Sequence, residues 1–223
     1  MLPNLACLNN IRVVLMHTSH PGNIGSSARA MKNMGLSHLV LVQPKHFPDP
    51  QADALASGAN DILENAQVVH SLEEALADCH FAIALTARWR EFSMPFSDAR
   101  QAATTLISAT QAGKVALVFG TEMSGLENAD ILRCQHICHI PTNPDYSSLN
   151  LAQAVQLLAY EIRMAAGLGL AERPFAAAEK AQIAEIEYFY THLEKTLIEI
   201  GFLNPAAPRR LMPRLRRLFG RAE

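Results

Sequence analysis

The sequence predicts an α/β fold built on a parallel sheet. Short apolar runs alternate with helical stretches, the runs are apolar throughout, and turn-rich segments follow them. Strands without polar alternation are typical of a sheet covered on both faces by helices. Ligands of such sheets bind at the carboxyl ends of the strands. The predicted strands are Ile11–Met16, His38–Val42, Gln67–Val69, Phe81–Leu85, Val115–Phe119 and His136–Ile140.

Helical stretches lie between these runs. The first strand is followed by the turn-rich HTSHPGNIGSS, and a helix is expected over Ala28–Met34, ended by Gly35. A looser stretch follows the second strand. Ser71 and Glu74 have capping-box spacing and open a short helix. The remaining predicted helices are Arg100–Ala109, Leu149–Ala166 ended by Gly167, and Ala176–Ile200.

The composition changes near Gly167–Pro174, which predicts two parts: a domain over residues 1–167 and a helical extension over 168–223. From Asn204 to Glu223 six arginines stand against one acid, a net +5, which leaves −7 for the rest of a chain of net charge −2. This asymmetry indicates an anionic partner for the tail. Its arginines include Arg209, Arg210, Arg214, Arg216 and Arg217.

Composition also bounds the class of protein. The start of the chain does not resemble a secretory signal, and no stretch approaches eighteen uninterrupted apolar residues. Four cysteines in a chain of 223 residues fit reduced thiols better than a disulfide framework. We therefore expect a cytoplasmic protein that does not enter a membrane.

Three loops are candidates for the chemistry. The first, between His20 and Met31, contains Asn23, two glycines and Arg29. It is either an anion-binding helix start or a plain tight turn. The second is Gly120-x-Glu122-x-x-Gly125, where a bare backbone and one carboxylate follow a buried strand, or where an acid merely caps a turn. The third runs over residues 140–150, and capping alone would explain its serines and asparagine.

Together, in this order, the three loops resemble the motifs of the SpoU branch of the SPOUT RNA 2'-O-methyltransferases. Asn23-x-Gly25 with Arg29 is similar to motif one, Gly120-x-Glu122-x-x-Gly125 to motif two, and Asn143-Pro144 with Ser147-Ser148-Leu149-Asn150 to motif three. The resemblance runs nearly end to end. Thr121 departs from it, because several relatives have arginine there.

The resemblance implies a Rossmann-like SPOUT domain with a C-terminal deep trefoil knot over about residues 115–166, and S-adenosylmethionine as cofactor, leaving as S-adenosylhomocysteine. Arg29 is the implied catalytic residue, which we expect to stabilise the developing alkoxide or to orient the ribose, since a guanidinium is a poor base. Asn23, Glu122 and Asn150 are expected to brace the loops. The implied cofactor-binding residues are Leu85, Thr86, Ala87, Gly120, Ile140, Ser147, Ser148 and Leu149.

The resemblance also implies a homodimer, because the family's arginine reaches the cofactor of the other subunit. The motif-one helix and the long helix would form the interface, and on the long helix three-and-four spacing selects Ala152, Val155, Leu158, Ala159 and Ile162. The implied substrate is tRNA, at cytidine or uridine 32, which opens the anticodon loop. Arg88 and Arg90 flank Trp89 and are expected to contact RNA, where a solvated loop is the alternative.

The sequence gives less support to other sites and functions. CQHICH places Cys134, His136, Cys138 and His139 together, and in a strand Cys134, His136 and Cys138 would share one face. Three ligands two apart do not easily close a tetrahedron, so no metal site is expected. The paired serines lack a nucleophile elbow. A non-catalytic RNA-binding protein that keeps the fold is the main alternative function. A dinucleotide-dependent oxidoreductase is disfavoured because the GxGxxG turn is absent.

Overall fold

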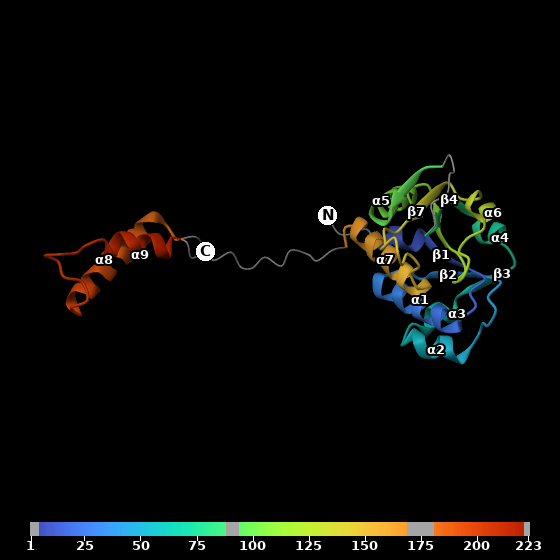
Figure 1. Ribbon diagram of the computed structural model, residues 1–223, viewed down its shortest axis with the longest axis horizontal. Helices are drawn as coiled ribbons and strands as arrows, with labels where there is room; N and C mark the ends of the chain where they lie inside the picture. Colours follow the sequence, from blue (N-terminus) through green and yellow to red (C-terminus); the bar gives the residue numbers. More distant parts are fainter. Residues whose placement is uncertain (1–4, 88–93, 169–180, 221–223) are drawn as a thin grey trace. The chain divides into compact units, whose positions relative to one another are not determined.

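A computed structural model describes residues 5–87, 94–168 and 181–220 (Figure 1). Contacts divide the chain into two compact units, Met1–Ala171 and Glu172–Glu223. Within the described residues, every helix falls short of the length and apolar character that a membrane crossing requires.

The first unit is built on a seven-stranded sheet in the order β3-β2-β1-β6-β4-β7-β5, and every pair of neighbours is parallel. The predicted fold class, a parallel α/β sheet, is confirmed. The chain adds β2 and β3 on one side of β1 and its later strands on the other side, beginning with β6 as the neighbour of β1. Ligands of such folds bind where the strand order reverses in this way. The strands are β1 Ile11–Met16, β2 His38–Val42, β3 Gln67–Val69, β4 Cys79–Leu85, β5 Phe96–Asp98, β6 Lys114–Phe119 and β7 His136–His139.

Two apolar clusters cover the two faces of the sheet. Along β1, Val13 and Leu15 belong to one cluster, and Val14 and Met16 belong to the other. α1, α5 and α7 contribute to the first cluster, and α4 and α6 contribute to the second. This explains why the strands are apolar throughout. The helices of this unit are α1 Pro21–Met34, α2 Pro50–Ala56, α3 Asn60–Glu64, α4 Leu72–Leu76, α5 Ala99–Ala109, α6 Asn128–Ile131 and α7 Leu151–Ala165.

Helix α1 begins earlier than the sequence predicts. The predicted turn is wrong over Pro21–Ser27, because these residues are already helical. Gly25 is needed for packing: a Cβ there would lie 2.0 Å from the carbonyl oxygen of Ala52 in α2. Its role is therefore to let two helices approach closely, and not to expose N–H groups to an anion.

Several smaller elements also differ. The looser stretch after β2 contains α2 and α3, and neither β5 nor α6 was predicted. Ser71 Oγ accepts a hydrogen bond from the backbone N–H of Glu74 at 3.1 Å, as expected. The Glu74 carboxylate, however, accepts from the N–H of His70 at 2.8 Å, one residue before the expected donor. Only one half of the predicted capping box is present.

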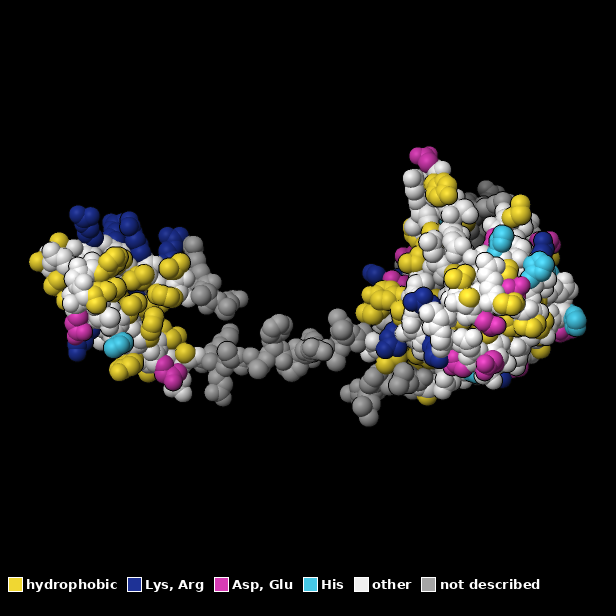
Figure 2. All heavy atoms as spheres, turned by 90° about the horizontal axis from the view of Figure 1, so that it is seen from below, with side chains coloured by type: hydrophobic (Ala, Val, Ile, Leu, Met, Phe, Trp, Pro, Cys, Tyr) yellow, Lys and Arg dark blue, Asp and Glu magenta, His cyan; other side chains and the backbone are white. Residues whose placement is uncertain are grey.

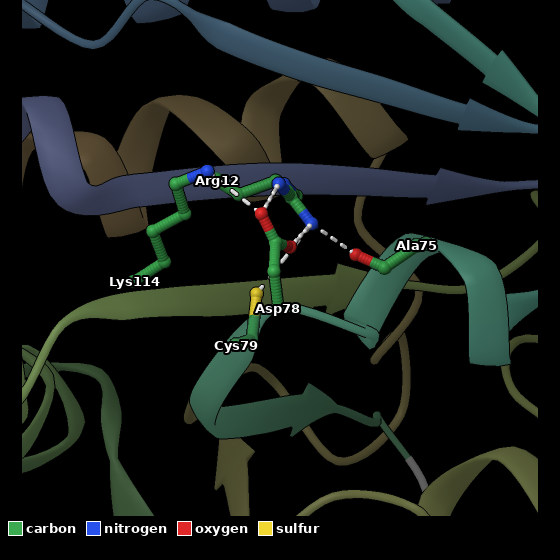
Figure 3. Close-up of polar contacts among 5 residues, drawn as sticks. All are labelled: Arg12, Ala75, Asp78, Cys79 and Lys114. Atoms are coloured by element: carbon green, nitrogen blue, oxygen red, sulfur yellow. Dashed lines mark hydrogen bonds and ion pairs between the residues drawn. The ribbon is translucent and has the colours of Figure 1, made fainter.

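A buried arginine ties the amino edge of the sheet together (Figure 3). Arg12, in β1, is 9% exposed and donates to both carboxylate oxygens of Asp78, at 2.8 and 3.2 Å, and to the carbonyl of Ala75. Lys114, at the start of β6, reaches the same carboxylate at 2.7 Å. Hydrogen bonds from Arg12 and Lys114 hold the pKa of Asp78 below its usual value. These contacts link β1, β6 and the segment before β4 at the edge away from the predicted site.

The second unit is a pair of helices, α8 Ile183–Glu199 and α9 Leu211–Phe219. The predicted helix Ala176–Ile200 is observed from Ile183 onward, and residues 176–180 lie outside the described part of the chain. Arg216 of α9 joins the helices: it makes two 2.6 Å contacts with the carboxylate of Glu187 and lies 4.3 Å from the ring centre of Tyr190. Among the described residues of this unit, only Tyr190 and Leu203 are buried.

Candidate active site

A cavity of about 310 Å³ opens at the carboxyl edge of the sheet, where β6, β4 and β7 lie side by side. The segments after all three strands line it, as does the start of α7. The structure therefore brings together motif two, motif three and the segment after β4. All eight residues predicted to bind the cofactor line this cavity: Leu85, Thr86, Ala87, Gly120, Ile140, Ser147, Ser148 and Leu149.

Motif two forms a tight turn whose backbone approaches itself closely. A Cβ on Gly120 would lie 2.1 Å from the carbonyl carbon of Gly125, so only glycine fits. Gly125 has φ +71°, a conformation that favours glycine. Thr121 closes the turn, since its Oγ1 accepts from the N–H of Ser124 at 3.1 Å and its backbone bridges to Gly125. The residue that departs from the family pattern thus shapes one wall of the cavity.

One chain of hydrogen bonds connects the three motifs. Glu122 of motif two accepts from the side-chain amide of Asn23 of motif one at 3.0 Å. Asn23 Oδ1 accepts from the amide of Asn150 of motif three at 2.9 Å. The backbone N–H groups of Ser19 and His20 also donate to Glu122, at 3.1 and 3.2 Å. Sequence reasoning missed the last two donors, because every residue except proline has a backbone N–H and the residue type does not show which one will donate.

Glu122 is held in its charged form. Burial alone would raise the pKa of this carboxyl, but hydrogen bonds from Asn23 and from the backbone of Glu122, Ser19 and His20 outweigh burial, so the pKa lies below its usual value. An ionised carboxylate with this many donors is a fixed acceptor. Its contacts join loops and leave it poorly placed to move a proton.

Asn150 caps α7, whose first helical residue is Leu151 and not Leu149 as the sequence predicts. Its Oδ1 accepts from the N–H of Ala152 at 2.9 Å while its amide reaches Asn23. Ser147 and Ser148 therefore lie in the loop before the helix, and both are exposed at the cavity. One asparagine thus sets both the start of the helix and the position of this loop.

The opposite wall is fixed from β7. The N–H of Thr86 donates to the carbonyl of Cys138 at 3.1 Å, and Nδ1 of His139 lies 2.9 Å from the carbonyl oxygen of Thr86. Because a carbonyl only accepts, Nδ1 carries the proton. The His139 ring is also stacked on Phe96. Sequence reasoning placed His139 in a metal motif and missed this supporting contact.

The other members of CQHICH do not converge. Cys134 precedes β7 and lies in the apolar cluster on one face of the sheet, whereas Cys138 lies in the cluster on the other face, so the expectation that they share a face is wrong. Burial raises the pKa of each thiol to about 12. Nε2 of His136 lies 2.7 Å from the hydroxyl of Ser97. No group of three His, Cys, Asp or Glu side chains suited to a metal occurs among the described residues.

Arg29 is exposed, and it does not line this cavity. It lines a neighbouring groove of about 560 Å³ between α1 and α7, which the cavity meets at Leu149. Asn150 also lines the groove. Within the described part of the chain, no lysine or arginine lines the cavity itself. A single copy of the chain therefore keeps its candidate catalytic cation outside its candidate cofactor site.

The long helix α7 presents a different face from the one predicted for the dimer. The five selected residues point into the core of their own unit, since each is at most 9% exposed. The face left open carries Leu157, Tyr160 and Met164, which are 42%, 47% and 43% exposed. The three-and-four spacing therefore identifies the face of α7 that packs into the core of its own unit: Ala152, Val155, Leu158, Ala159 and Ile162.

The arginines predicted to contact RNA fall into three groups. Arg88 and Arg90 lie outside the described residues. Arg216 is held by Glu187 and Tyr190 within the helix pair. The other four are exposed, and no ion pair to them occurs among the described residues: Arg209, Arg210, Arg214 and Arg217.

Comparison with known proteins agrees with this geometry. The model of the SpoU rRNA Methylase family matches residues 10–160, and the model of the C-terminal domain of the tRNA methyltransferase TrmJ matches residues 184–223. The chain is 53% identical to the tRNA (cytidine/uridine/adenosine-2'-O-)-methyltransferase TrmJ of Pseudomonas aeruginosa, over 96% of this chain and 88% of that protein. It is 48% identical to the tRNA (cytidine/uridine-2'-O-)-methyltransferase TrmJ of Klebsiella pneumoniae, over 96% and 90%.

A solved structure gives the same result. The crystal structure of TrmJ from Z. mobilis ZM4 superimposes with a TM-score of 0.76 at 38% identity, covering 93% of this chain and 88% of that one. The family model and the relatives together span both units of the chain. The protein therefore belongs to the SpoU methylase family of the SPOUT methyltransferases, among the TrmJ proteins.

Proposed function

We propose that this protein is a tRNA (cytidine/uridine-2'-O-)-methyltransferase that uses S-adenosylmethionine to methylate the ribose at position 32, where the anticodon loop opens. The observation that carries the proposal is the convergence of the motif loops. Eight residues named from the family resemblance line one cavity. The Glu122–Asn23–Asn150 chain ties motif one to that cavity. The relatives of this protein described above are named tRNA 2'-O-methyltransferases.

The cavity suits S-adenosylmethionine. Its volume lies within the range of about 300–1,000 Å³ that small-molecule sites occupy. Bound there, the cofactor supplies an activated methyl group on a sulfonium, so that the protein chiefly positions the acceptor. The segments Leu85–Ala87 and Ser147–Leu149 would hold it largely through backbone groups. Glu122 already accepts hydrogen bonds from four groups of Ser19, His20 and Asn23, and it keeps the loops in register.

Arg29 is the proposed catalytic residue. A guanidinium is a poor base, so we do not assign Arg29 as the base for the ribose hydroxyl. A fixed positive charge beside that hydroxyl would stabilise the alkoxide as it forms, or hold the ribose through an adjacent phosphate. In either case the proton leaves to phosphate or to water.

We propose that a second copy of the chain brings its Arg29 to this cavity. Support comes from two features: the cavity lining holds no cation of its own among the described residues, and Arg29 lies in a groove beside α7. The open stripe of Leu157, Tyr160 and Met164 runs along the same helix and would be buried by a partner helix. A dimer through α1 and α7 would bury this stripe and would bring the Arg29 of one copy to the cavity of the other.

The two parts of the chain have different proposed roles. We propose that residues 1–167 form the methyltransferase domain, with the trefoil knot over about residues 115–166, and that residues 168–223 bind RNA. Four exposed arginines of the second unit supply positive charge, and none of them forms an ion pair with another described residue. Contacts from such residues go chiefly to phosphates and position the RNA without reading its sequence.

Two measurements test the proposal. Calorimetry of the purified protein should show binding of S-adenosylmethionine and no binding of NAD. After incubation with unmodified tRNA and S-adenosylmethionine, mass mapping should place one 2'-O-methyl group at position 32. A protein that binds tRNA but neither binds the donor nor methylates RNA would be the non-catalytic RNA-binding alternative. Methylation at another nucleotide would keep the reaction and correct the position.

A further inference from the structure

Two large apolar side chains of the methyltransferase unit are exposed on the loops of the cavity. Met123 is 94% exposed and Tyr146 is 81% exposed, the two highest values for a large apolar residue among the described residues of this unit. Met123 belongs to motif two and lines the cavity, and Tyr146 directly precedes the cavity-lining Ser147 of motif three. Single exposed apolar residues are ordinary surface, but two on the loops of one cavity are candidates for contact with a ligand.

Hydrogen bonds fix the backbone of both turns. In motif two, the N–H of Gly125 donates to the carbonyl of Thr121 at 3.0 Å, and the turn between them carries Met123. In motif three, the N–H of Tyr146 donates to the carbonyl of Asn143, also at 3.0 Å. A side chain on a fixed turn loses less conformational freedom on binding than one on a free loop. The two exposed side chains are therefore held ready for a ligand.

The covalent structure of RNA brings a base to the opening of this cavity. In the proposed reaction, the ribose 2'-hydroxyl must reach the methyl group of S-adenosylmethionine bound in the cavity. The ribose carbon that carries this hydroxyl is bonded directly to the carbon that carries the base. The base of the methylated nucleotide therefore lies beside the loops that form the cavity, which are the loops that carry Met123 and Tyr146.

The charge around the cavity suits a base better than a phosphate. Among the described residues no lysine or arginine of the chain lines the cavity, and Glu122 there is ionised. Asp145, next to Tyr146, is exposed and adds a second acidic group. Figure 2 shows lysines and arginines gathered along one margin of the C-terminal unit, which offers phosphates a separate binding surface. A neutral base with two flat faces is the part of a nucleotide that fits Met123 and Tyr146.

Contact with these two side chains would not distinguish the two proposed substrates. Cytidine has an amino donor at the ring position where uridine has a carbonyl acceptor. A site that hydrogen-bonds this edge accepts one base and rejects the other by a large factor. An aromatic ring instead contacts the flat face that every base has, so stacking tolerates either base. Tyr146 and Met123 are therefore suited to an enzyme that accepts both pyrimidines.

On the basis of the proposed function, we infer that Tyr146 stacks on the base of the methylated nucleotide and that Met123 contacts the same base from motif two. These contacts hold the nucleotide with its ribose toward the cofactor. They fix where the nucleotide lies and leave the identity of its pyrimidine unread. Tyr146 is thus a substrate-binding residue, separate from the residues that hold S-adenosylmethionine.

Methylation kinetics of the full-length protein test this contact. Two tRNA transcripts that differ only at nucleotide 32, cytidine or uridine, are methylated by wild type, Tyr146→Ala and Tyr146→Phe. Removal of the ring should lower kcat/KM for tRNA about five- to a hundredfold, and by the same factor for both transcripts. Tyr146→Phe keeps the ring and should stay within about twofold of wild type. Leu132→Ala, an exposed apolar residue that does not line the cavity, is the matched control and should leave kcat/KM unchanged.

Cofactor affinity separates this role from a structural one. Tyr146 lies outside the cavity lining, so calorimetry should give the same S-adenosylmethionine affinity for Tyr146→Ala and wild type. Three results would overturn the inference: an unchanged kcat/KM in Tyr146→Ala, a loss confined to one transcript, or an equal loss of cofactor affinity. If wild type binds S-adenosylmethionine but methylates neither transcript, the proposed function is refuted instead. Methylation mapped to another nucleotide moves the exchange of cytidine for uridine to that nucleotide.

Photochemical cross-linking locates the base directly. A tRNA with 5-iodouridine at nucleotide 32 is irradiated in complex with the full-length protein, and the adduct is mapped by mass spectrometry. The adduct should form on Tyr146 or Met123, and Tyr146→Ala should leave only the adduct on Met123. An adduct confined to other residues would contradict the stacking contact.

Oxidative footprinting distinguishes a base from a second copy of the chain. In the free protein Met123 and Tyr146 should react as exposed side chains, and tRNA should protect both. Protection that is already complete without tRNA would mean that another protein chain covers them, which would overturn the inference. Leu132, exposed and outside the cavity loops, should react equally with and without tRNA.

Discussion

The two units of this protein hold their functional surfaces in place in opposite ways. The methyltransferase unit covers both faces of a seven-stranded sheet with two apolar clusters and builds its cavity from backbone turns that nearly touch. The C-terminal unit buries two of its described side chains and displays arginines from α9 and from the turn before it. A surface made of packed backbone tolerates almost no change, whereas a surface made of exposed charges changes by degrees.

The candidate catalytic arginine should give the largest effect of any single change. Arg29→Ala removes a charge that acts only when the alkoxide forms, so methylation should fall by a hundredfold to a thousandfold. Dimer mass and S-adenosylmethionine affinity should stay unchanged, because the proposed role of the Arg29 charge is toward the ribose and not toward the cofactor. Single-turnover methyl transfer, sedimentation and calorimetry measure the three quantities. Wild-type turnover in this variant would refute the assigned role.

A mixture of two impaired proteins sharpens this prediction. Arg29→Ala lacks the cation, and a cavity variant such as Gly120→Ala binds the cofactor weakly, so neither should be active alone at a low S-adenosylmethionine concentration. If Arg29 acts across the dimer interface, a mixed dimer has one site with both parts intact, and mixing should restore methylation toward half of the wild-type value per mixed dimer. No recovery from exchanged subunits would place Arg29 in its own chain's site. Arg133→Ala, an exposed arginine on another surface, is the control.

Closing the motif-two turn should give the next largest effect. Gly120→Ala places a methyl group 2.1 Å from the carbonyl carbon of Gly125, so the turn must open. Overpacking of this kind costs about 1–3 kcal/mol, which is about five- to a hundredfold in S-adenosylmethionine affinity. Gly58→Ala is the control for strain away from the cavity: its φ of +88° disfavours alanine, although a Cβ there meets nothing within 4 Å. Equal cofactor affinity in both variants would show that the turn is not part of the binding surface.

The sequence predicts the strands better than the helix starts, for a physical reason. Ile11–Met16, His38–Val42 and Gln67–Val69 have the same bounds in the structure. A fully apolar, β-branched run has few alternatives to a buried strand. The start of α1 was mistaken because Pro21, Gly22 and Gly25 look like a turn. Gly25 is instead required by the approach of Ala52, a contact between segments that no local pattern contains.

The site shows the same limit. The residues that line the cavity were named because motif resemblance fixes their positions, and no property of Leu85 or Ile140 alone predicts a cofactor. The bracing of Glu122 by the N–H groups of Ser19 and His20 was out of reach, because every residue except proline has that donor. The position of Arg29 in a neighbouring groove required the packing of α1 against α7.

In the C-terminal unit, two neighbouring arginines separate structure from RNA binding. Arg214→Ala should weaken tRNA binding a few-fold and lower the slope of log affinity against log salt by about one, since one phosphate contact is lost. Arg216→Ala should instead loosen α8 against α9, because its guanidinium is paired with Glu187 and lies over Tyr190. Hydrogen exchange of α8 and salt titration of tRNA binding tell the two apart. Identical salt slopes for both variants would contradict this division.

Ionisation of Glu122 should give the smallest effect, seen in acid. Its folded pKa lies below the usual value of 4.5, so it binds protons more readily in the unfolded chain. Its contribution to stability is therefore complete above pH 4.5 and is lost as the pH falls through the folded pKa. Glu122→Gln should flatten the fall of melting temperature in acid without removing it, because Asp78 also has a depressed pKa and remains. An unchanged acid profile would mean that the carboxylate charge contributes nothing to holding the three motifs together.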